Sequence, residues 1–199
     1  MSYSLPIPKP FAHHGPHGGP SDEQLLQAYR NGDHPAFNLL FERYRDRIVG
    51  YVWRMLRNQE EAEEIALETF CRVLEGAWKP GGSFRAFLFT VAHRLSIDRL
   101  RKRQRTQRFQ RLWKAAAPPS RSPEQAVAAD ETHRALELAL ANLPELHRAT
   151  VLLYYGQELK SREVAEIMGC SDQQVRSRLS YARKQLRQLL PDELTEGEP

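Results

Sequence analysis

The chain has 199 residues, of which 41% are hydrophobic and 27% are charged, and its formal net charge is +4. This composition excludes collagen-like, disulfide-rich and wholly disordered proteins. No window approaches the roughly 18 consecutive apolar residues of a membrane-spanning helix, and the Pro-rich N-terminus lacks a signal-peptide core. We therefore expect a cytoplasmic protein without direct membrane insertion. The two cysteines lack CxxC spacing, which indicates reduced thiols and no thiolate metal site.

The first half of the chain predicts a tail and four helices. Residues 1–20 are rich in Pro, Gly and His, so we expect a disordered tail whose histidines hold no metal. Ser21 and Gln24 have capping-box spacing and begin a first helix, and Pro35 suits the first turn of a second. Two further helices, over about 59–75 and from about 83, carry apolar residues at steps of three and four, which is typical of a buried helical face.

The second half predicts a linker and four more helices. Residues 112–124 include three prolines and little core-forming content, which indicates a flexible linker. Helices are expected over about 125–142, 144–155, 161–168 and 172–190, followed by an acidic tail at 191–199. No strand pattern of useful length occurs. The predicted fold class is therefore all-α, with two small helical domains, 21–111 and 125–190.

Charge is concentrated in three of these segments. Residues 59–75 contain six acidic side chains and one basic one, residues 99–111 contain seven basic ones, and residues 176–187 contain five. Neither basic segment contains an acid. Clustered Lys and Arg gain free energy by releasing counterions from a polyanion, so the pattern predicts two contacts with nucleic acid. A solvated helix face remains the alternative for either basic segment alone.

Residues 161–190 have the pattern of a helix-turn-helix motif. Gly169 suits the left-handed turn between two steeply crossing helices, and Ser171 is placed to cap the second helix. The second helix has a buried stripe, opposite which Gln173, Ser177 and Lys184 point outward. Such a face reads base edges and phosphates in DNA-binding motifs. An ordinary amphipathic hairpin is the alternative.

Two further features in the first domain suggest partners. Phe89 lies off the apolar stripe of its helix, next to the first basic segment, and is expected to stack an unpaired base, whereas Phe87 also fits a core role. Leu67 and Cys71 form an apolar strip flanked by acids, which suggests a protein partner with a basic rim. Packing of this strip on the first helix is the alternative.

Motifs for catalysis are absent from the sequence. It contains no phosphate-binding GxxxxGK[ST] loop, no HExxH and no glycine-framed serine nucleophile. We expect no enzyme activity, no cofactor and no metal. A nucleic-acid-processing enzyme is disfavoured because the acids cluster on one helix without metal-ligand partners.

With these motifs in order, the chain resembles bacterial RNA polymerase sigma factors of the extracytoplasmic-function (ECF) type. Residues 61–78 (EAEEIALETFCRVLEGAW) resemble the family's polymerase-binding segment, residues 83–105 its strand-melting and minus-10 segment, and residues 143–190 its minus-35-reading domain. The chain departs from the family pattern at Leu67, where Gln is usual, and at Arg94, where Asn is common.

The resemblance implies a sigma factor that directs RNA polymerase to promoters and aids promoter melting, with the polymerase core, promoter DNA and an anti-sigma factor as partners. A free-standing helix-turn-helix regulator is the alternative. The implied polymerase-binding residues are Glu61, Glu64, Ile65, Leu67, Glu68 and Phe70. The implied minus-10 residues are Phe87, Phe89, Arg94, Asp98, Arg101 and Arg103. The implied minus-35 residues are Ser171, Gln173, Gln174, Arg176, Ser177, Arg178, Arg183 and Lys184.

Overall fold

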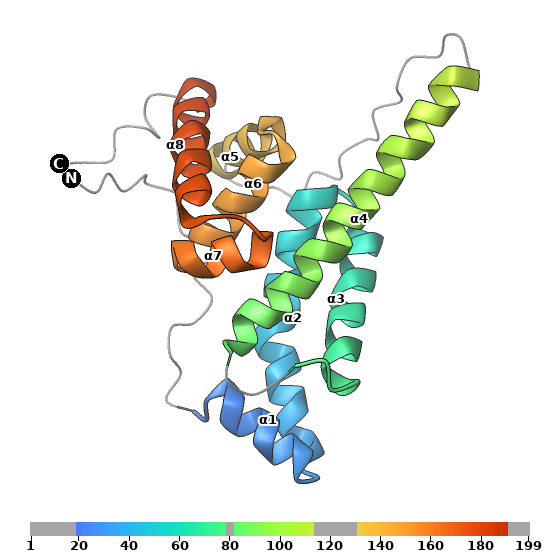
Figure 1. The fold of residues 1–199 in the computed structure, drawn as a ribbon, viewed down its shortest axis with the longest axis vertical. Coiled ribbons are helices and arrows are strands. Elements are labelled where there is room, and N and C mark those ends of the chain that lie inside the picture. The colour runs from blue at the N-terminus through green and yellow to red at the C-terminus, as the bar shows by residue number, and fades with distance from the viewer. Residues whose placement is uncertain (1–18, 79–81, 114–130, 191–199) are drawn as a thin grey trace, which may run out of the picture.

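The computed structural model describes residues 19–78, 82–113 and 131–190, with side chains placed at 19–78, 82–108 and 134–190. These residues are all-α, as predicted (Figure 1). The predicted N-terminal tail, linker and acidic tail fall almost entirely outside them. The helices are α1 (Asp22–Arg30), α2 (His34–Leu56), α3 (Gln59–Leu74), α4 (Phe84–Trp113), α5 (Glu131–Asn142), α6 (Glu145–Val151), α7 (Ser161–Met168) and α8 (Asp172–Leu189), with a π-helical segment η1 (Leu152–Gly156).

Helices α1 to α4 form the N-terminal lobe. Helix α1 begins at the predicted capping box, in which Ser21 Oγ accepts from the Gln24 amide and Gln24 Oε1 accepts from the Ser21 amide. Helix α2 packs against α1, α3 and α4. Its predicted stripe lies in the core, where Leu40, Ile48 and Val52 are fully buried. The helices are thus held together by apolar burial along the predicted stripes.

Helices α5 to α8 form the C-terminal lobe, and α7 and α8 make the predicted helix-turn-helix. Gly169 has φ of 60°, the left-handed conformation that glycine adopts at little cost. Ser171 caps α8 in a capping box with Gln174. The apolar stripe of α8 is buried at Val175, Leu179 and Ala182. The turn chemistry read from the sequence is therefore confirmed.

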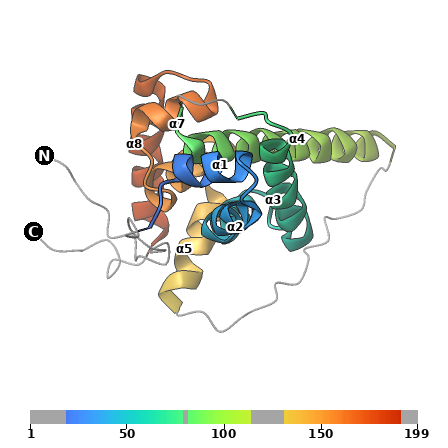
Figure 2. The ribbon, with the colours of Figure 1, turned by 90° about the horizontal axis from the view of Figure 1, so that it is seen from below.

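The two lobes pack against each other. Helix α7 lies against α4, where Arg85 and Glu163 are 3.7 Å apart. The Glu137 carboxylate of α5 accepts from Arg54 Nε of α2 at 2.7 Å and lies 3.2 Å from Arg57. Figures 1 and 2 show the C-terminal lobe lying beside α2 and one end of α4. The buried residues of both lobes form one continuous hydrophobic core.

Among the described residues, none of the helices combines the length and the apolar character required to cross a bilayer.

Candidate polymerase and nucleic-acid interfaces

An exposed apolar strip runs along α3. Leu67, Cys71 and Leu74, at steps of four and three, share one side of the helix, and their side chains are exposed. Leu67 is 56% exposed, so it does not pack on α1. We call these three residues the α3 strip. Glu64 and Glu68 flank it, which gives the exposed side of α3 an apolar centre and an acidic edge.

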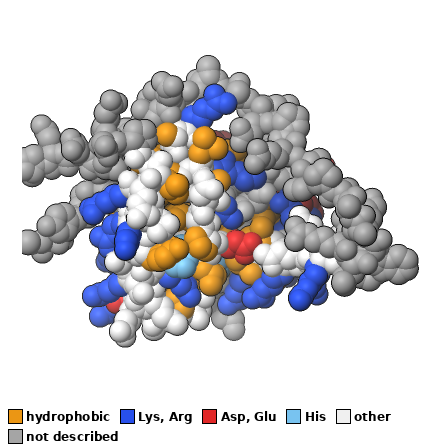
Figure 3. All heavy atoms as spheres, turned by 90° about the horizontal axis from the view of Figure 1, so that it is seen from above, with side chains coloured by type: hydrophobic (Ala, Val, Ile, Leu, Met, Phe, Trp, Pro, Cys, Tyr) orange, Lys and Arg blue, Asp and Glu red, His pale blue; other side chains and the backbone are white. Residues whose placement is uncertain are grey.

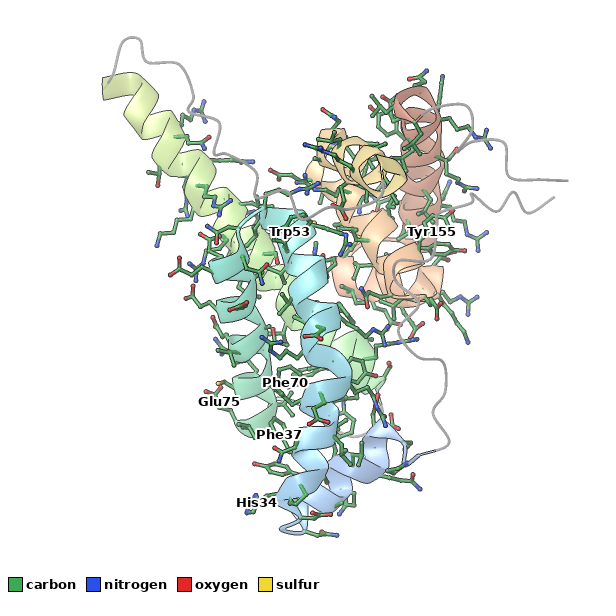
Figure 4. The ribbon with its side chains drawn as sticks, turned by 180° about the vertical axis from the view of Figure 1, so that it is seen from behind. His34, Phe37, Trp53, Phe70, Glu75 and Tyr155 are labelled. Carbon is green, nitrogen blue, oxygen red and sulfur yellow. The ribbon has the colours of Figure 1, made fainter. Side chains whose placement is uncertain are left out.

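Two of the implied polymerase contacts, Ile65 and Phe70, lie in the core and are not accessible to a partner in this structure. Their side chains are 1% and 3% exposed. The Phe70 ring packs against Phe41 at 4.8 Å and Phe37 at 6.1 Å between centroids, and Figure 4 shows Phe37 and Phe70 in the N-terminal lobe. Both residues belong to the apolar stripe of α3, so the 3.6-residue period already predicted their burial.

Ion pairs join the acidic helix α3 to the basic part of α4. Arg99 donates to Glu64 at 2.8 Å, and Arg103 donates to Glu61 at 2.7 Å. Arg103 also donates to the carbonyl of Leu56, the last residue of α2, at 2.7 Å. The hydrogen bond from Arg99 to Glu64 raises the pKa of Arg99 above its usual value. Arg103, expected at the minus-10 element, is therefore held inside the lobe by two contacts.

The opposite side of α4 carries an exposed polar stripe. At 100° per residue, Phe87, Arg94 and Asp98 lie within about 40° of one direction, and so do Arg101, Arg105 and Arg108. We call these six residues the outer stripe. Phe87 is half-buried and the other five are exposed. The part of the stripe from Asp98 to Arg108 lines a hollow on the surface of α4.

Phe89 lies on the core side of α4, about 140° from the outer stripe. Its side chain is 0% exposed, and its ring meets Tyr51 edge-on at 5.8 Å between centroids. The prediction that Phe89 is free to stack a base is wrong for this arrangement. Helix α4 is covered by α2, α3 and α7 together, so its buried face is wider than one apolar stripe.

A buried hydrogen bond links Tyr51 of α2 to His93 of α4, at 2.8 Å between Oη and Nδ1. Burial, and to a smaller extent the positive charges of Arg178 and Arg94, lowers the pKa of His93 to about 4. The imidazole is therefore neutral at pH 7. Because Arg178 belongs to α8, this histidine lies where the two lobes meet.

The outward face of α8 is exposed and basic. Gln173, Ser177 and Lys184 point to solvent, and Arg176, which is 73% exposed at its side chain, pairs with Asp172 at 2.8 Å. The Ser161 hydroxyl donates to Asp172 and lowers the pKa of its carboxyl, with a smaller contribution from Arg176. Figure 3, which views the molecule of Figure 1 from above, shows hydrophobic side chains flanked by Lys and Arg on this side.

Four of the implied minus-35 residues have other contacts. Ser171 and Gln174 form the capping box of α8. Arg178 was expected to hold a phosphate, but its Nη1 lies 3.4 Å from the Cys170 sulfur and its charge acts on His93. Arg183 Nε donates to the Leu179 carbonyl at 3.3 Å. Of the implied minus-35 residues, Gln173, Ser177 and Lys184 are exposed without such contacts, and Arg176 is exposed and paired with Asp172.

Comparison with known proteins identifies both lobes. The Sigma-70 region 2 family model matches residues 40–106, and the Sigma-70 region 4 model matches residues 133–186. The ECF RNA polymerase sigma factor SigE of Mycolicibacterium smegmatis is 31% identical, with 86% of this chain and 70% of SigE covered. The chain belongs to the ECF-type RNA polymerase sigma factors. It therefore directs RNA polymerase to promoters in transcription initiation.

Other sigma factors resemble the chain over most of its length. RNA polymerase sigma factor CarQ of Myxococcus xanthus is 30% identical, with 83% of this chain and 95% of CarQ covered. The structure of sigma factor RpoE from Bartonella quintana, solved with the anti-sigma factor NepR, has a TM-score of 0.62 and 21% identity. It covers 77% of this chain and 95% of RpoE. This likeness shows that the sigma-factor fold includes both lobes.

Proposed function

We propose that this sigma factor binds its partners through three surfaces. Helix α3 binds the polymerase core, the outer stripe of α4 binds the minus-10 element, and α8 binds the minus-35 element. The division into domains 21–111 and 125–190 belongs to this proposal, as do action in the cytoplasm and the absence of catalysis by the chain itself. The observation that carries it is that charged side chains of opposite sign remain exposed on separate helices within the two matched regions.

The α3 strip and its acidic edge form the proposed polymerase contact. Leu67, Glu64 and Glu68 are accessible from one side of α3, whereas Ile65 and Phe70 support the helix from beneath. An apolar centre with a charged edge is the usual anatomy of a protein interface. The same strip is a fitting site for an anti-sigma factor, which would then compete with polymerase. The NepR complex of RpoE supports an anti-sigma partner for this chain.

We expect Leu67→Asp to weaken binding to the polymerase core by about tenfold or more, because a carboxylate replaces an apolar anchor and adds to the acidic edge. Leu67 is exposed, so the free energy of unfolding should change by less than about 0.5 kcal/mol. Surface plasmon resonance with purified core polymerase measures the loss. Leu39→Asp, which makes the same change at an exposed leucine of α2, is the matched control. Unchanged binding of both polymerase and anti-sigma factor would show that the strip is unused surface.

Minus-35 recognition is proposed for the exposed face of α8. Gln173, Arg176 and Ser177 meet base edges there, and Lys184 holds a phosphate. The pair between Arg176 and Asp172 is solvent-exposed and weak, so DNA can displace it.

We expect Arg176→Ala to weaken promoter binding by about 1 to 3 kcal/mol and to relax the base preference at one minus-35 position. Binding of the holoenzyme to a panel of single-base promoter variants measures both effects. Arg187→Ala, on the same helix, is the matched control for loss of charge. An equal loss on every promoter sequence would show that Arg176 contacts only phosphate.

A gel shift with and without core polymerase tests the proposal as a whole. Promoters for this assay come from transcription starts mapped with the reconstituted holoenzyme. We expect a specific complex only when core polymerase is present. Tight, specific binding of duplex promoter DNA by the chain alone would favour the free-standing helix-turn-helix regulator.

A further inference from the structure

One side of α8 carries more positive charge than its described neighbours balance. At 100° per residue, this side is a sector of about 100° that holds Arg176, Arg183, Lys184 and Arg187. We call these four residues the basic face of α8. Arg183 is half-buried and the other three are exposed. Asp172 pairs with Arg176, but among the described side chains no carboxylate lies within ion-pair distance of the other three. The basic face therefore attracts negatively charged groups.

An acidic segment directly follows this helix. Residues 191–199 contain four acids and no basic residue, and none of the three proposed surfaces uses them. Helix α8 ends at Leu189, and Leu190 has the extended conformation expected before a proline, with φ of −95° and ψ of 145°. The chain therefore stops following the helix at the point where the acidic segment begins.

We propose that residues 191–199 fold back along α8 and bind its basic face, where they compete with DNA for the minus-35 surface. This inference rests on the minus-35 role of α8 proposed above and adds a regulation of that surface by the chain itself. Carboxylates and phosphates form the same charge-assisted hydrogen bonds with Lys and Arg. The basic face cannot hold the acidic segment and a DNA backbone at once, so the segment lowers the affinity of the free chain for promoter DNA.

The length of the segment fits this path. From Leu190 back to Lys184 and Arg176, the distances along the helix axis are about 9 and 21 Å, at 1.5 Å per residue. An extended chain spans up to about 3.3 Å per residue, so Glu193 and Glu196 lie up to about 10 and 20 Å from Leu190. Both acids can therefore reach the basic face after the chain reverses direction.

The tether makes weak contacts sufficient for this binding. Ion pairs between exposed side chains are individually weak and are screened by salt. A tether of a few residues, however, supplies an effective concentration in the millimolar range. The acidic segment therefore occupies the basic face in a substantial fraction of free chains at low salt. Duplex DNA displaces it, because the duplex offers a denser and longer array of negative charge.

Zero-length crosslinking of the full chain tests the contact itself. A carbodiimide joins a lysine amine to a carboxylate that it contacts, and Lys184 is the only lysine of α8. We expect a link within one chain between Lys184 and an acid of residues 191–199, identified by mass spectrometry and lost at about 500 mM salt. Lys184→Arg keeps the charge without the reactive amine, so this variant should lose the link. The absence of the link in the unmodified chain, or a link between two chains, would overturn the proposal.

DNA binding by the full chain without polymerase tests the competition. Glu193→Gln and Glu196→Gln, introduced together, should tighten binding to a fluorescent minus-35 duplex about threefold or more at about 50 mM salt, and less than about twofold at about 500 mM. Glu60→Gln with Glu63→Gln removes the same charge from exposed positions of α3 and should change the affinity by less than about twofold. An equal gain in both double variants would show an effect of net charge alone and would overturn the proposal. The crosslink does not depend on DNA, and Arg176→Ala in the holoenzyme tests the minus-35 role separately, so failure of one proposal is distinguishable from failure of the other.

Discussion

Phe89→Ala is expected to lower the free energy of unfolding by about 3 to 5 kcal/mol. The Phe89 ring is fully buried between α4 and α2 and meets Tyr51 edge-on, so truncation leaves a cavity and removes an aromatic contact. A loss of this size is a large fraction of the stability of an ordinary domain. Urea unfolding followed by circular dichroism, with the slope compared between variants, measures it.

Phe87 supplies the matched control for this prediction. Its ring is half-buried on the outer stripe, so Phe87→Ala should cost clearly less stability and should instead reduce binding of the unpaired minus-10 strand by the holoenzyme. Phe89→Leu keeps most of the core volume and guards against complete unfolding of the alanine variant. A Phe89→Ala protein with unchanged unfolding but weakened strand binding would contradict a core role for Phe89.

The contrast between these two phenylalanines shows what the sequence can predict. Helix α3 is buried along one stripe, and its period places Ala62, Ile65 and Phe70 in the core. Helix α4 is contacted by α2, α3 and α7, so a residue off its main stripe, such as Phe89, is also buried. The number of neighbours around a helix is a tertiary property, and no local period encodes it.

The charged residues show the same limit of prediction from local sequence. The exposed faces of α3 and α8 follow from helical spacing, and the helix-turn-helix follows from Gly169 and Ser171. The pairing of Arg103 with Glu61 depends on two helices lying side by side, which charge counts along the chain do not reveal. Likewise, the charge of Arg178 acts on His93 because the lobes pack together. Periodicity predicts which way a side chain faces, and packing determines what it meets there.

The free energy of unfolding should fall as the pH is lowered from 6.5 to 4, with His93 contributing about 3 kcal/mol to the loss. The pKa of His93 is about 4 in the folded chain against 6.5 for an ordinary histidine. Below pH 6.5 the unfolded chain therefore binds a proton that the folded chain excludes. His93 therefore makes its full contribution to the free energy of unfolding above pH 6.5. This contribution is lost as the pH falls through 4, below which His93 is protonated in both the folded and the unfolded chain.

The groups that face His93 explain why folding opposes its charge. Tyr51 of α2 hydrogen-bonds the ring, while Arg94 of α4 and Arg178 of α8 repel the imidazolium.

Urea unfolding at several pH values, compared between the unmodified chain and His93→Gln, isolates the effect of this residue from that of the carboxylates that also titrate in acid. We expect the free energy of unfolding of His93→Gln to depend less on pH than that of the unmodified chain. His147→Gln is the control, because His147 is also near Arg178 but is more exposed. Parallel curves for the chain and His93→Gln would contradict a neutral, buried His93.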